Sequence, residues 1–539
     1  MQRIVAMEYA DPVGAYALEH FGIEYLYPYQ RLVVANILDA MQEGLDGVET
    51  ERQVVILPTG AGKSLCFQLP AALCPGPSLI VYPLLGLMSD QQRRLDGTGL
   101  ETVVLRGGMG AEKKAAALKS IVSGKARIII TNPEMLAIPG IRAAIGDAGI
   151  AHFVIDEAHC VSEWGDGFRP AYLGLGDAIK AVSPRMVTAF TATASPPILA
   201  RVSQVLFGDK PYRLVYGIPD RPNIRYEVWP ALSMKEALRD ALSRLERPML
   251  VFTRSRSSSE ILAEQARAGS SGKEARFYHA GLDAAERASL EAWFMASSDG
   301  VLFSTCAYGM GMDKANVRTV VHFGPSASVE AYLQESGRAG RDGKASLALL
   351  IRQASREDYI HNTVYDPEPG IGALGMAQKM ATQRTRKMDD YARGSYSCRR
   401  MFLLSALGYD DAEHVACSSC DLCDGSARKL APGTMELLDL CTRHCRRFTT
   451  RQAAAFMTGT GAGIHAPLRG ALHEWKPEEA LEGIGSAINV GLMGIRSRWP
   501  WKNRIVATHL SRAVRRHHLM SLDHHRPRRR EEPRPSWTT

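Results

Sequence analysis

The 539-residue sequence lacks the features that mark membrane and secreted proteins. It contains no run of about 18 apolar residues, the length that a membrane-spanning helix needs. Its N-terminal segment carries Glu8 and Asp11 where a signal peptide would continue its apolar stretch. We therefore expect a cytoplasmic protein with no membrane partner.

Cysteine is scarce, with ten residues in the whole chain, and four of them lie between Cys398 and Cys423. This bunching excludes a secreted disulfide framework and is typical of a metal site. The composition is otherwise ordinary, with 45% hydrophobic and 23% charged residues. This composition predicts a folded protein, and the length predicts three or four domains at roughly 150 residues each.

Net charge is small outside the C-terminal end. The formal charge is +8, but the last 44 residues, from Arg496, hold 12 basic and 3 acidic side chains, so the residues before them sum to −1. The positive net charge of the protein therefore comes from its C-terminal tail. It does not by itself indicate that the rest of the chain binds nucleic acid. The tail could add salt-sensitive DNA affinity, or it could be a solvated segment without a partner.

Short apolar runs alternate with longer polar-faced segments in two series, one over about residues 50–210 and one over about 248–351. This alternation predicts two α/β domains with buried parallel sheets, over 1–215 and 216–355. After them we expect a helical module over 356–428, a mostly helical region over 429–495 and a disordered tail over 496–539. The segment from Phe448 could belong to a winged helix, and an ordinary helix pair explains it nearly as well.

A small-residue loop after the first apolar strand predicts a phosphate site. It comprises Thr59, Gly60, Ala61 and Gly62 and leads through Lys63 and Ser64 into a helix. The N–H groups of such a loop can surround phosphates, the lysine can reach the outer phosphates, and the serine hydroxyl can ligate Mg²⁺. Because the strict P-loop pattern has glycine where this chain has Leu57, a simple strand-to-helix turn stays open for the loop taken alone.

Two further pairs of residues suit ATP hydrolysis. Asp156 and Glu157 end an apolar strand, where the first could hold Mg²⁺ through its hydration shell and the second could deprotonate the attacking water. Arg338 and Arg341 lie three residues apart, which predicts one helical face. They could stabilise the transferring phosphate if two domains close on one nucleotide; a solvated basic helix face is the alternative.

Four cysteines are spaced for a structural metal. Eighteen residues separate Cys398 from the group Cys417, Cys420 and Cys423, whose two-residue gaps let a turn deliver three sulfurs to one ion. The spacing predicts a tetrahedral Zn²⁺ site with no position left open for catalysis. Cys441 and Cys445 are expected to pack in a core instead.

Several motifs together resemble the RecQ family of superfamily 2 DNA helicases, over roughly residues 15–425. They begin at the following residues: Pro58 (Pro-Thr-Gly-Ala-Gly-Lys-Ser), Tyr82 (Tyr-Pro-Leu-Leu-Gly-Leu-Met), Ile155 (Ile-Asp-Glu-Ala-His-Cys-Val-Ser-Glu-Trp-Gly), Phe168 (Phe-Arg-Pro), Thr191 (Thr-Ala-Thr-Ala), Arg221 (Arg-Pro-Asn-Ile), Tyr278 (Tyr-His-Ala-Gly-Leu), Gly309 (Gly-Met-Gly-Met-Asp-Lys) and Gln334 (Gln-Glu-Ser-Gly-Arg-Ala-Gly-Arg). The cysteine pattern is also similar to the family's zinc module.

The resemblance implies two tandem RecA-like parallel-sheet domains, a helical zinc-binding module and a C-terminal region that could be a winged helix. It implies an ATP-dependent motor that moves 3′ to 5′ on single-stranded DNA and separates partly duplex DNA in repair or recombination. By the same resemblance, Lys63 and Ser64 bind phosphate and Mg²⁺, Asp156 and Glu157 are the catalytic acids, Arg338 and Arg341 act across the domain cleft, and Gln30 contacts adenine.

The resemblance also assigns a DNA-contacting loop that contains Trp164, Phe168 and Arg169, because aromatic rings stack on bases. A tryptophan and a phenylalanine in a core are the alternative. Ile23 replaces the family's usual stacking tyrosine, with Tyr25 or Tyr27 as possible substitutes. Two other functions stay open: a DNA-stimulated ATPase or translocase that does not unwind, and a DNA-binding or annealing module without turnover.

Overall fold

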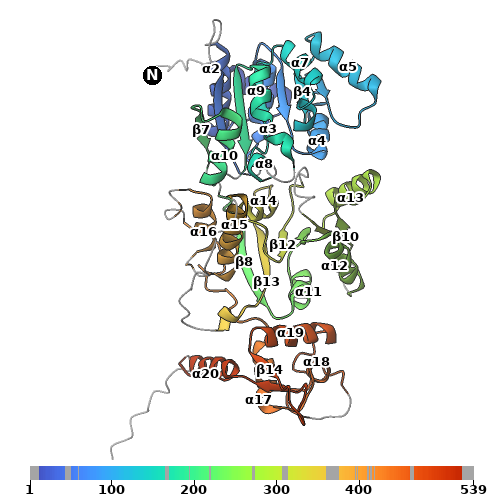
Figure 1. Cartoon of the computed structure of the whole chain (residues 1–539), viewed down its shortest axis with the longest axis vertical. Helices are drawn as coiled ribbons and strands as arrows, with labels where there is room; N and C mark the ends of the chain where they lie inside the picture. The colour runs from blue at the N-terminus through green and yellow to red at the C-terminus, as the bar shows by residue number, and fades with distance from the viewer. Residues whose placement is uncertain are drawn as a thin grey trace, which may run out of the picture.

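The computed structural model describes residues 11–42, 50–58, 60–163, 169–192, 195–217, 220–269, 274–305, 314–359, 376–394, 396, 398–409, 412, 416–417, 419–461 and 466–524. These residues form three tiers along the long axis of the molecule (Figure 1). No helix among them is long and apolar enough to cross a membrane.

The first tier is a parallel sheet with the strand order β3-β4-β2-β5-β6-β1-β7. Its strands are β1 (Glu51–Ile56), β2 (Ser78–Val81), β3 (Thr102–Val104), β4 (Ile128–Thr131), β5 (His152–Ile155), β6 (Met186–Thr191) and β7 (Arg213–Tyr216). Separate apolar clusters lie on its two faces, which is why the central strands read as unbroken apolar runs.

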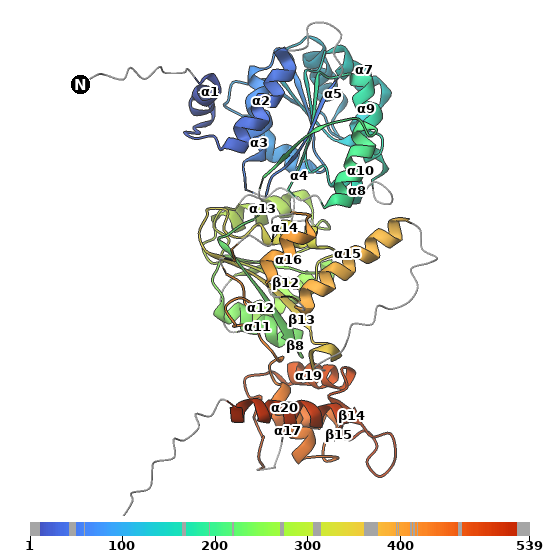
Figure 2. The same cartoon turned by 90° about the vertical axis from the view of Figure 1, so that its left-hand side faces the viewer.

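Helices cover both faces of this sheet (Figure 2). They are α1 (Pro12–Phe21), α2 (Pro28–Gln42), α3 (Lys63–Leu73), α4 (Leu85–Leu95), α5 (Ala111–Val122), α6 (Pro133–Leu136), α7 (Pro139–Asp147), α8 (Cys160–Glu163), α9 (Leu175–Val182) and α10 (Pro196–Phe207). Because strands in a parallel sheet all end at one edge, the loops after β1 and β5 open on the same side of the domain, toward the second tier.

The second tier is another parallel sheet, with the order β10-β11-β9-β12-β13-β8. It comprises β8 (Ile224–Ala231), α11 (Met234–Arg244), β9 (Met249–Phe252), α12 (Arg256–Ala268), β10 (Ala275–Tyr278), α13 (Ala284–Ala296), β11 (Val301–Ser304), β12 (Thr319–Phe323), α14 (Val329–Ser336) and β13 (Ser346–Gln353). The prediction of two tandem parallel-sheet domains is thereby confirmed.

The cysteine-bearing module packs directly on the second sheet. Its helices are α15 (Met376–Arg393) and α16 (Arg399–Ala406), and α16 lies beside β8 (Figure 1). Met388 and Leu403 from these helices join Tyr226 and Tyr332 of the sheet domain in one buried cluster. The module therefore shares a hydrophobic core with the second domain and does not form a separate one.

The third tier holds α17 (Thr434–Arg443), α18 (Thr450–Met457), α19 (Pro477–Asn489), β14 (Met493–Ile495), β15 (Ile505–Ala507) and α20 (His509–His524). β14 and β15 pair antiparallel, so three helices are followed by a hairpin and a fourth helix. Cys441 is buried in this tier as expected, whereas Cys445 is exposed because α17 has ended before it.

The expectation of a disordered tail from Arg496 is wrong for the residues up to His524, which contain β15 and α20. Ile505 and Val514 are 2% and 8% exposed in the core of the third tier, and Arg515 pairs with Asp439 of α17 at 2.9 Å. A few well-placed apolar side chains suffice to dock such elements, and their sparse spacing leaves no clear period in the sequence.

Candidate active site and metal centre

The loop between β1 and α3 has the backbone of a phosphate cradle. Gly60 and Gly62 have φ angles of +86° and +74°, a region that side chains with a Cβ rarely adopt. A Cβ at residue 62 would also lie 2.6 Å from Gln30 Nε2, so a side chain there would displace the Gln30 amide. No side chain caps the start of α3, which leaves the N–H groups of Lys63 and Ser64 for an anion, while the Leu65 N–H donates to Gly62 O at 3.1 Å.

The side chains at the start of α3 face the acidic pair after β5. Lys63 Nζ lies 3.7 Å from Glu157 Oε1, and His159 Nδ1 lies 3.4 Å from Glu157 Oε2. His159 is itself held by Thr191, at 3.1 Å. Glu157 has a φ of +50°, a strained angle for a side chain of its size, so the surrounding contacts fix an unfavourable backbone to place this carboxylate.

Burial and neighbouring charges act differently on the two adjacent acids. Burial, with the charge of Glu157 beside it, raises the pKa of Asp156 to about 7. Burial would raise the pKa of Glu157 too, but the positive charges of Lys63, Arg338 and Arg341, with the ring of His159 beside them, outweigh it and lower that pKa. Glu157 is therefore held charged, and a buried carboxylate in the position of Asp156 suits a divalent cation, which favours its charged form.

Arg338 and Arg341 bring the second domain into the same site. They are close enough to Glu157 to lower its pKa, and a Cβ at Gly60 would lie 4.0 Å from Arg341 Cγ. The alternative of a solvated basic face does not hold, because Arg338 is only 5% exposed. The helical-face argument is also wrong: α14 ends at Ser336, and both arginines lie in the turns that follow, where Gly340 has a φ of +53°.

Gln30 lies against the phosphate loop, with its Nε2 donating to Ala61 O at 3.1 Å and its Oε1 accepting from the Tyr27 N–H at 2.9 Å. Tyr29, which the sequence did not single out, also contacts the loop: its hydroxyl donates to the same Ala61 carbonyl at 3.3 Å. Tyr27 stacks on Tyr29 with ring centroids 5.4 Å apart. Tyr25 and Tyr27 are 63% and 52% exposed, so their rings are accessible to a base.

The candidate DNA-contacting residues are only partly described. Trp164 and Phe168 lie outside the described residues, so their roles stay predictions. The same holds for Thr59 of the phosphate loop. Arg169 is described: its Nε donates to Glu134 Oε1 at 2.8 Å, and its guanidinium also donates to the Pro83 carbonyl. These contacts anchor one end of the predicted DNA loop to the first domain.

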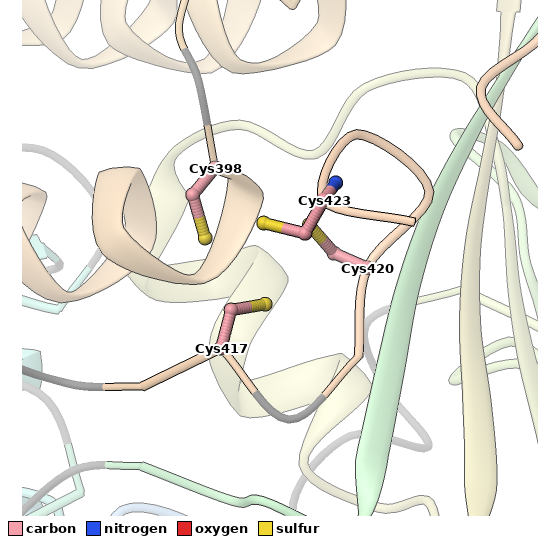
Figure 3. Close-up of side chains that lie close together, drawn as sticks. All are labelled: Cys398, Cys417, Cys420 and Cys423. Atoms are coloured by element: carbon pink, nitrogen blue, oxygen red, sulfur yellow. The ribbon is translucent and has the colours of Figure 1, made fainter. Parts of the chain in front are cut away.

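The four clustered cysteines converge on one point (Figure 3). The sulfur atoms of Cys398, Cys417, Cys420 and Cys423 all lie within 4.8 Å of one another. Cys398 caps the start of α16, and the turn between Cys420 and Cys423 brings the last two sulfurs together. Four thiols in this arrangement fit a tetrahedral Zn²⁺ site and leave no open position for catalysis.

Three family models match the chain in succession. They are DEAD/DEAH box helicase over residues 27–201, helicase conserved C-terminal domain over 233–343, and RecQ zinc-binding over 360–424. The second and third together cover the arginine turns and the four cysteines.

The chain is similar in sequence to known helicases. It is 34% identical over 397 residues to the probable ATP-dependent DNA helicase RecS of Bacillus subtilis, covering 70% of this chain and 77% of that protein. It is 31% identical over 417 residues to the ATP-dependent DNA helicase RecQ of Pasteurella multocida, covering 76% of this chain. The match spans 63% of that RecQ and 60% of the Haemophilus influenzae RecQ.

Solved structures share the fold. The helicase Lhr of Mycobacterium smegmatis, bound to single-stranded DNA and AMP-PNP, superposes with a TM-score of 0.51 at 19% identity, covering 94% of this chain and 62% of that one. The DEAD-box helicase Mss116, bound to single-stranded RNA, has a TM-score of 0.53 at 16% identity, covering 75% and 90%. These likenesses support two RecA-like domains.

Proposed function

Because this chain belongs to the RecQ family of ATP-dependent DNA helicases, we propose that it hydrolyses ATP to move 3′ to 5′ along single-stranded DNA and to unwind duplex DNA. One observation carries the proposal: Lys63 and Glu157 of the first domain and Arg338 and Arg341 of the second meet at one phosphate loop. Motors that hydrolyse nucleotides need such a shared site, because closing and opening the cleft converts turnover into domain motion.

Each residue of the site has a defined task in this proposal. ATP phosphates would rest on the N–H groups of the loop and of the first turn of α3, with Lys63 Nζ at the outer phosphates. Glu157 would orient the attacking water and accept its proton on a carboxylate oxygen. Arg338 and Arg341 would stabilise the charge on the transferring phosphoryl group. Mg²⁺, held by Ser64 and Asp156, neutralises phosphate charge when bound.

The proposed substrate is single-stranded and partly duplex DNA, in repair or recombination, and in bacteria the site of action would be the nucleoid. Trp164, Phe168 and Arg169 are the proposed DNA contacts in the first domain, and Cys398, Cys417, Cys420 and Cys423 are the proposed zinc ligands. Gln30 is the proposed adenine contact. DNA rather than RNA is proposed because the RecQ and RecS relatives described above are named DNA helicases.

The test is ATP hydrolysis with and without single-stranded DNA, beside a Lys63→Ala variant. We expect DNA to stimulate hydrolysis, RNA of the same sequence to stimulate it far less, and the variant to lose about 10²-fold or more in kcat, since it loses a charge at the phosphates. A zinc-loaded wild type that does not hydrolyse ATP would contradict the proposal and leave a DNA-binding or annealing module.

Unwinding is favoured over translocation alone by the hairpin of the third tier. Between β14 and β15, Trp499 is 88% exposed, and Trp501 is 44% exposed with Arg446 4.8 Å from its ring. Exposed aromatic rings beside arginines can stack on a terminal base pair while the cations contact phosphate.

We therefore expect Trp499→Ala to reduce strand separation on a tailed duplex by about 10-fold, from the loss of one stacking contact of ~1–3 kcal/mol. ATP hydrolysis stimulated by single-stranded DNA should stay within about twofold of wild type, because the hairpin is remote from the phosphate loop. Strand displacement and ATPase assays on the same preparations measure both, with Leu481→Ala, another exposed apolar side chain of this tier, as the control. Equal losses in the two assays would refute a dedicated role in unwinding.

A further inference from the structure

The segment that joins the two sheets, residues 220–223 between β7 and β8, has no task in the mechanism above, yet it contacts the arginine turns closely. Arg221 Nη1 donates to Gly337 O at 3.2 Å, and its Nη2 donates to Ala339 O at 3.2 Å and to Gly340 O at 2.8 Å. Asn223 Nδ2 donates to Gly340 O as well, at 2.8 Å, and to Lys344 O at 2.9 Å. Two side chains thus satisfy the backbone carbonyls of the turns that carry Arg338 and Arg341.

These contacts decide where the two arginines point. Carbonyl groups at a helix end have no hydrogen-bond partner within the helix. A donor that binds them fixes the conformation of the backbone there. Gly340 is held so closely that a Cβ there would lie 2.5 Å from Asn223 Nδ2. With the backbone on both sides fixed, the guanidinium groups of Arg338 and Arg341 are directed at the first domain before nucleotide binds.

Arg221 also lies at the interface between the domains. Its Nη1 would be 3.5 Å from a Cβ at Gly60, so the same guanidinium that binds the arginine turns lies against the phosphate loop. Its Nε donates to Asn223 Oδ1 at 3.4 Å, and its two terminal nitrogens donate to three carbonyls of the turns after α14. These hydrogen bonds favour a role in holding the turns.

The zinc module holds the backbone from which Arg221 projects. Arg400, two residues after Cys398, is 1% exposed and donates to Arg221 O at 3.0 Å and to Ile224 O at 2.7 Å. It also forms an ion pair with Asp220 and lies over the ring of Tyr226, 5.4 Å from its centroid. A continuous set of contacts therefore runs from the cysteine cluster through Arg400 and Arg221 to the arginine turns.

We infer that Arg221 is a positioning residue for ATP hydrolysis, which orients Arg338 and Arg341 by binding the turns that carry them, and that Arg400 of the zinc module holds Arg221 in place. The inference rests on the proposed function and deepens it. It adds a route by which the zinc module acts on the chemical step without touching nucleotide.

The test compares Arg221→Gln with Arg221→Lys in the full-length, zinc-loaded protein. Glutamine cannot bind three carbonyls, so kcat should fall by about 10- to 100-fold, while the dissociation constant of a fluorescent ATP analogue changes by less than about threefold. Lysine, a charged donor, should recover part of the loss. Arg225→Gln is the matched control, because Arg225 lies in the same stretch but binds Glu227 and Asp424, away from the turns. Its kcat should equal that of wild type.

A combined variant separates positioning from general structural damage. If Arg221 acts through Arg338 and Arg341, adding Arg221→Gln to a variant with both Arg338→Ala and Arg341→Ala should cost less than about threefold more in kcat. Multiplied losses in the combined variant would overturn the inference, as would a loss of nucleotide affinity that accounts for the whole effect, since Arg221 would then bind phosphate directly. Melting temperature and zinc content of each variant report whether it is folded.

Arg400→Gln is a second variant, which tests the inference even if Arg221→Gln does not fold. We expect it to lower kcat less than Arg221→Gln does and to leave nucleotide affinity unchanged, with one zinc still bound per chain. A wild-type kcat in folded Arg400→Gln would overturn the link to the zinc module. If wild type hydrolyses ATP and Arg221→Gln does so equally fast, this inference alone is overturned. If wild type does not hydrolyse ATP, the proposed function is contradicted, and this inference with it.

Discussion

Glu157→Gln should lower kcat for ATP hydrolysis by about 10²–10⁴-fold, the contribution expected of a general base. The amide keeps the size of the carboxylate but cannot accept a proton from water. It also removes the negative charge that lies 3.7 Å from Lys63 Nζ and 3.4 Å from His159 Nδ1. Nucleotide binding should be retained or become tighter, because a negative charge beside the phosphates is removed.

Single-turnover hydrolysis and titration with a fluorescent ATP analogue measure the two effects separately. Asp177→Asn is the control, because Asp177 is an acid of the same domain whose side chain is 78% exposed. Its kcat should not change. If Glu157→Gln kept kcat within tenfold of wild type, the proton would have to go to another group, and the assignment of Glu157 would be wrong.

Cys420→Ser is expected to have the largest effect on stability. Cys420 is fully buried, its backbone bridges to Tyr226 of β8, and its sulfur accepts from the Cys423 N–H at 3.4 Å. A structural zinc site contributes directly to folding free energy, about 10–16 kcal/mol in isolated zinc-finger peptides. Losing one thiolate ligand should therefore release the metal and lower the melting temperature markedly.

Zinc content by atomic emission and thermal unfolding are the measurements, with Cys445→Ser as the matched control because Cys445 is exposed and outside the cluster. The control should keep one zinc per chain and the wild-type melting temperature. Wild type treated with a strong chelator should resemble Cys420→Ser. Full zinc occupancy in Cys420→Ser would rule out this cysteine as a ligand.

The damage should spread beyond the metal site. Cys398 and Cys420 belong to the same buried cluster as Tyr226, Tyr332 and Leu403, so the module and the second sheet are one folding unit. Arg399 of α16 forms a buried ion pair with Asp421, next to Cys420. Loss of zinc would therefore loosen both the cysteine turn and the helix from which Arg400 reaches the segment between the sheets.

The sequence by itself was sufficient where a feature is local. The loop 59–64, the adjacent acids Asp156 and Glu157 and the cysteine group 417–423 are contiguous stretches, and their chemistry follows from the order of residues along a strand end or turn. The two parallel sheets were predictable for the same reason, because a strand buried on both faces must be a short unbroken apolar run. Each of these was read from neighbours in the chain.

Only the tertiary structure decided what depends on contacts between distant residues. The structure brings Arg338 and Arg341 close enough to Glu157 to lower its pKa, and it places both arginines in turns and not on a helix face. It also shows that Arg221 binds those turns and that Arg400 binds the backbone of Arg221. It also ordered β15 and α20 within a segment that sequence alone predicted to be disordered. Periodicity and spacing describe only nearby residues, whereas the contacts of Arg221 and Arg400 join positions more than a hundred residues apart and exist because two domains and a zinc module pack together.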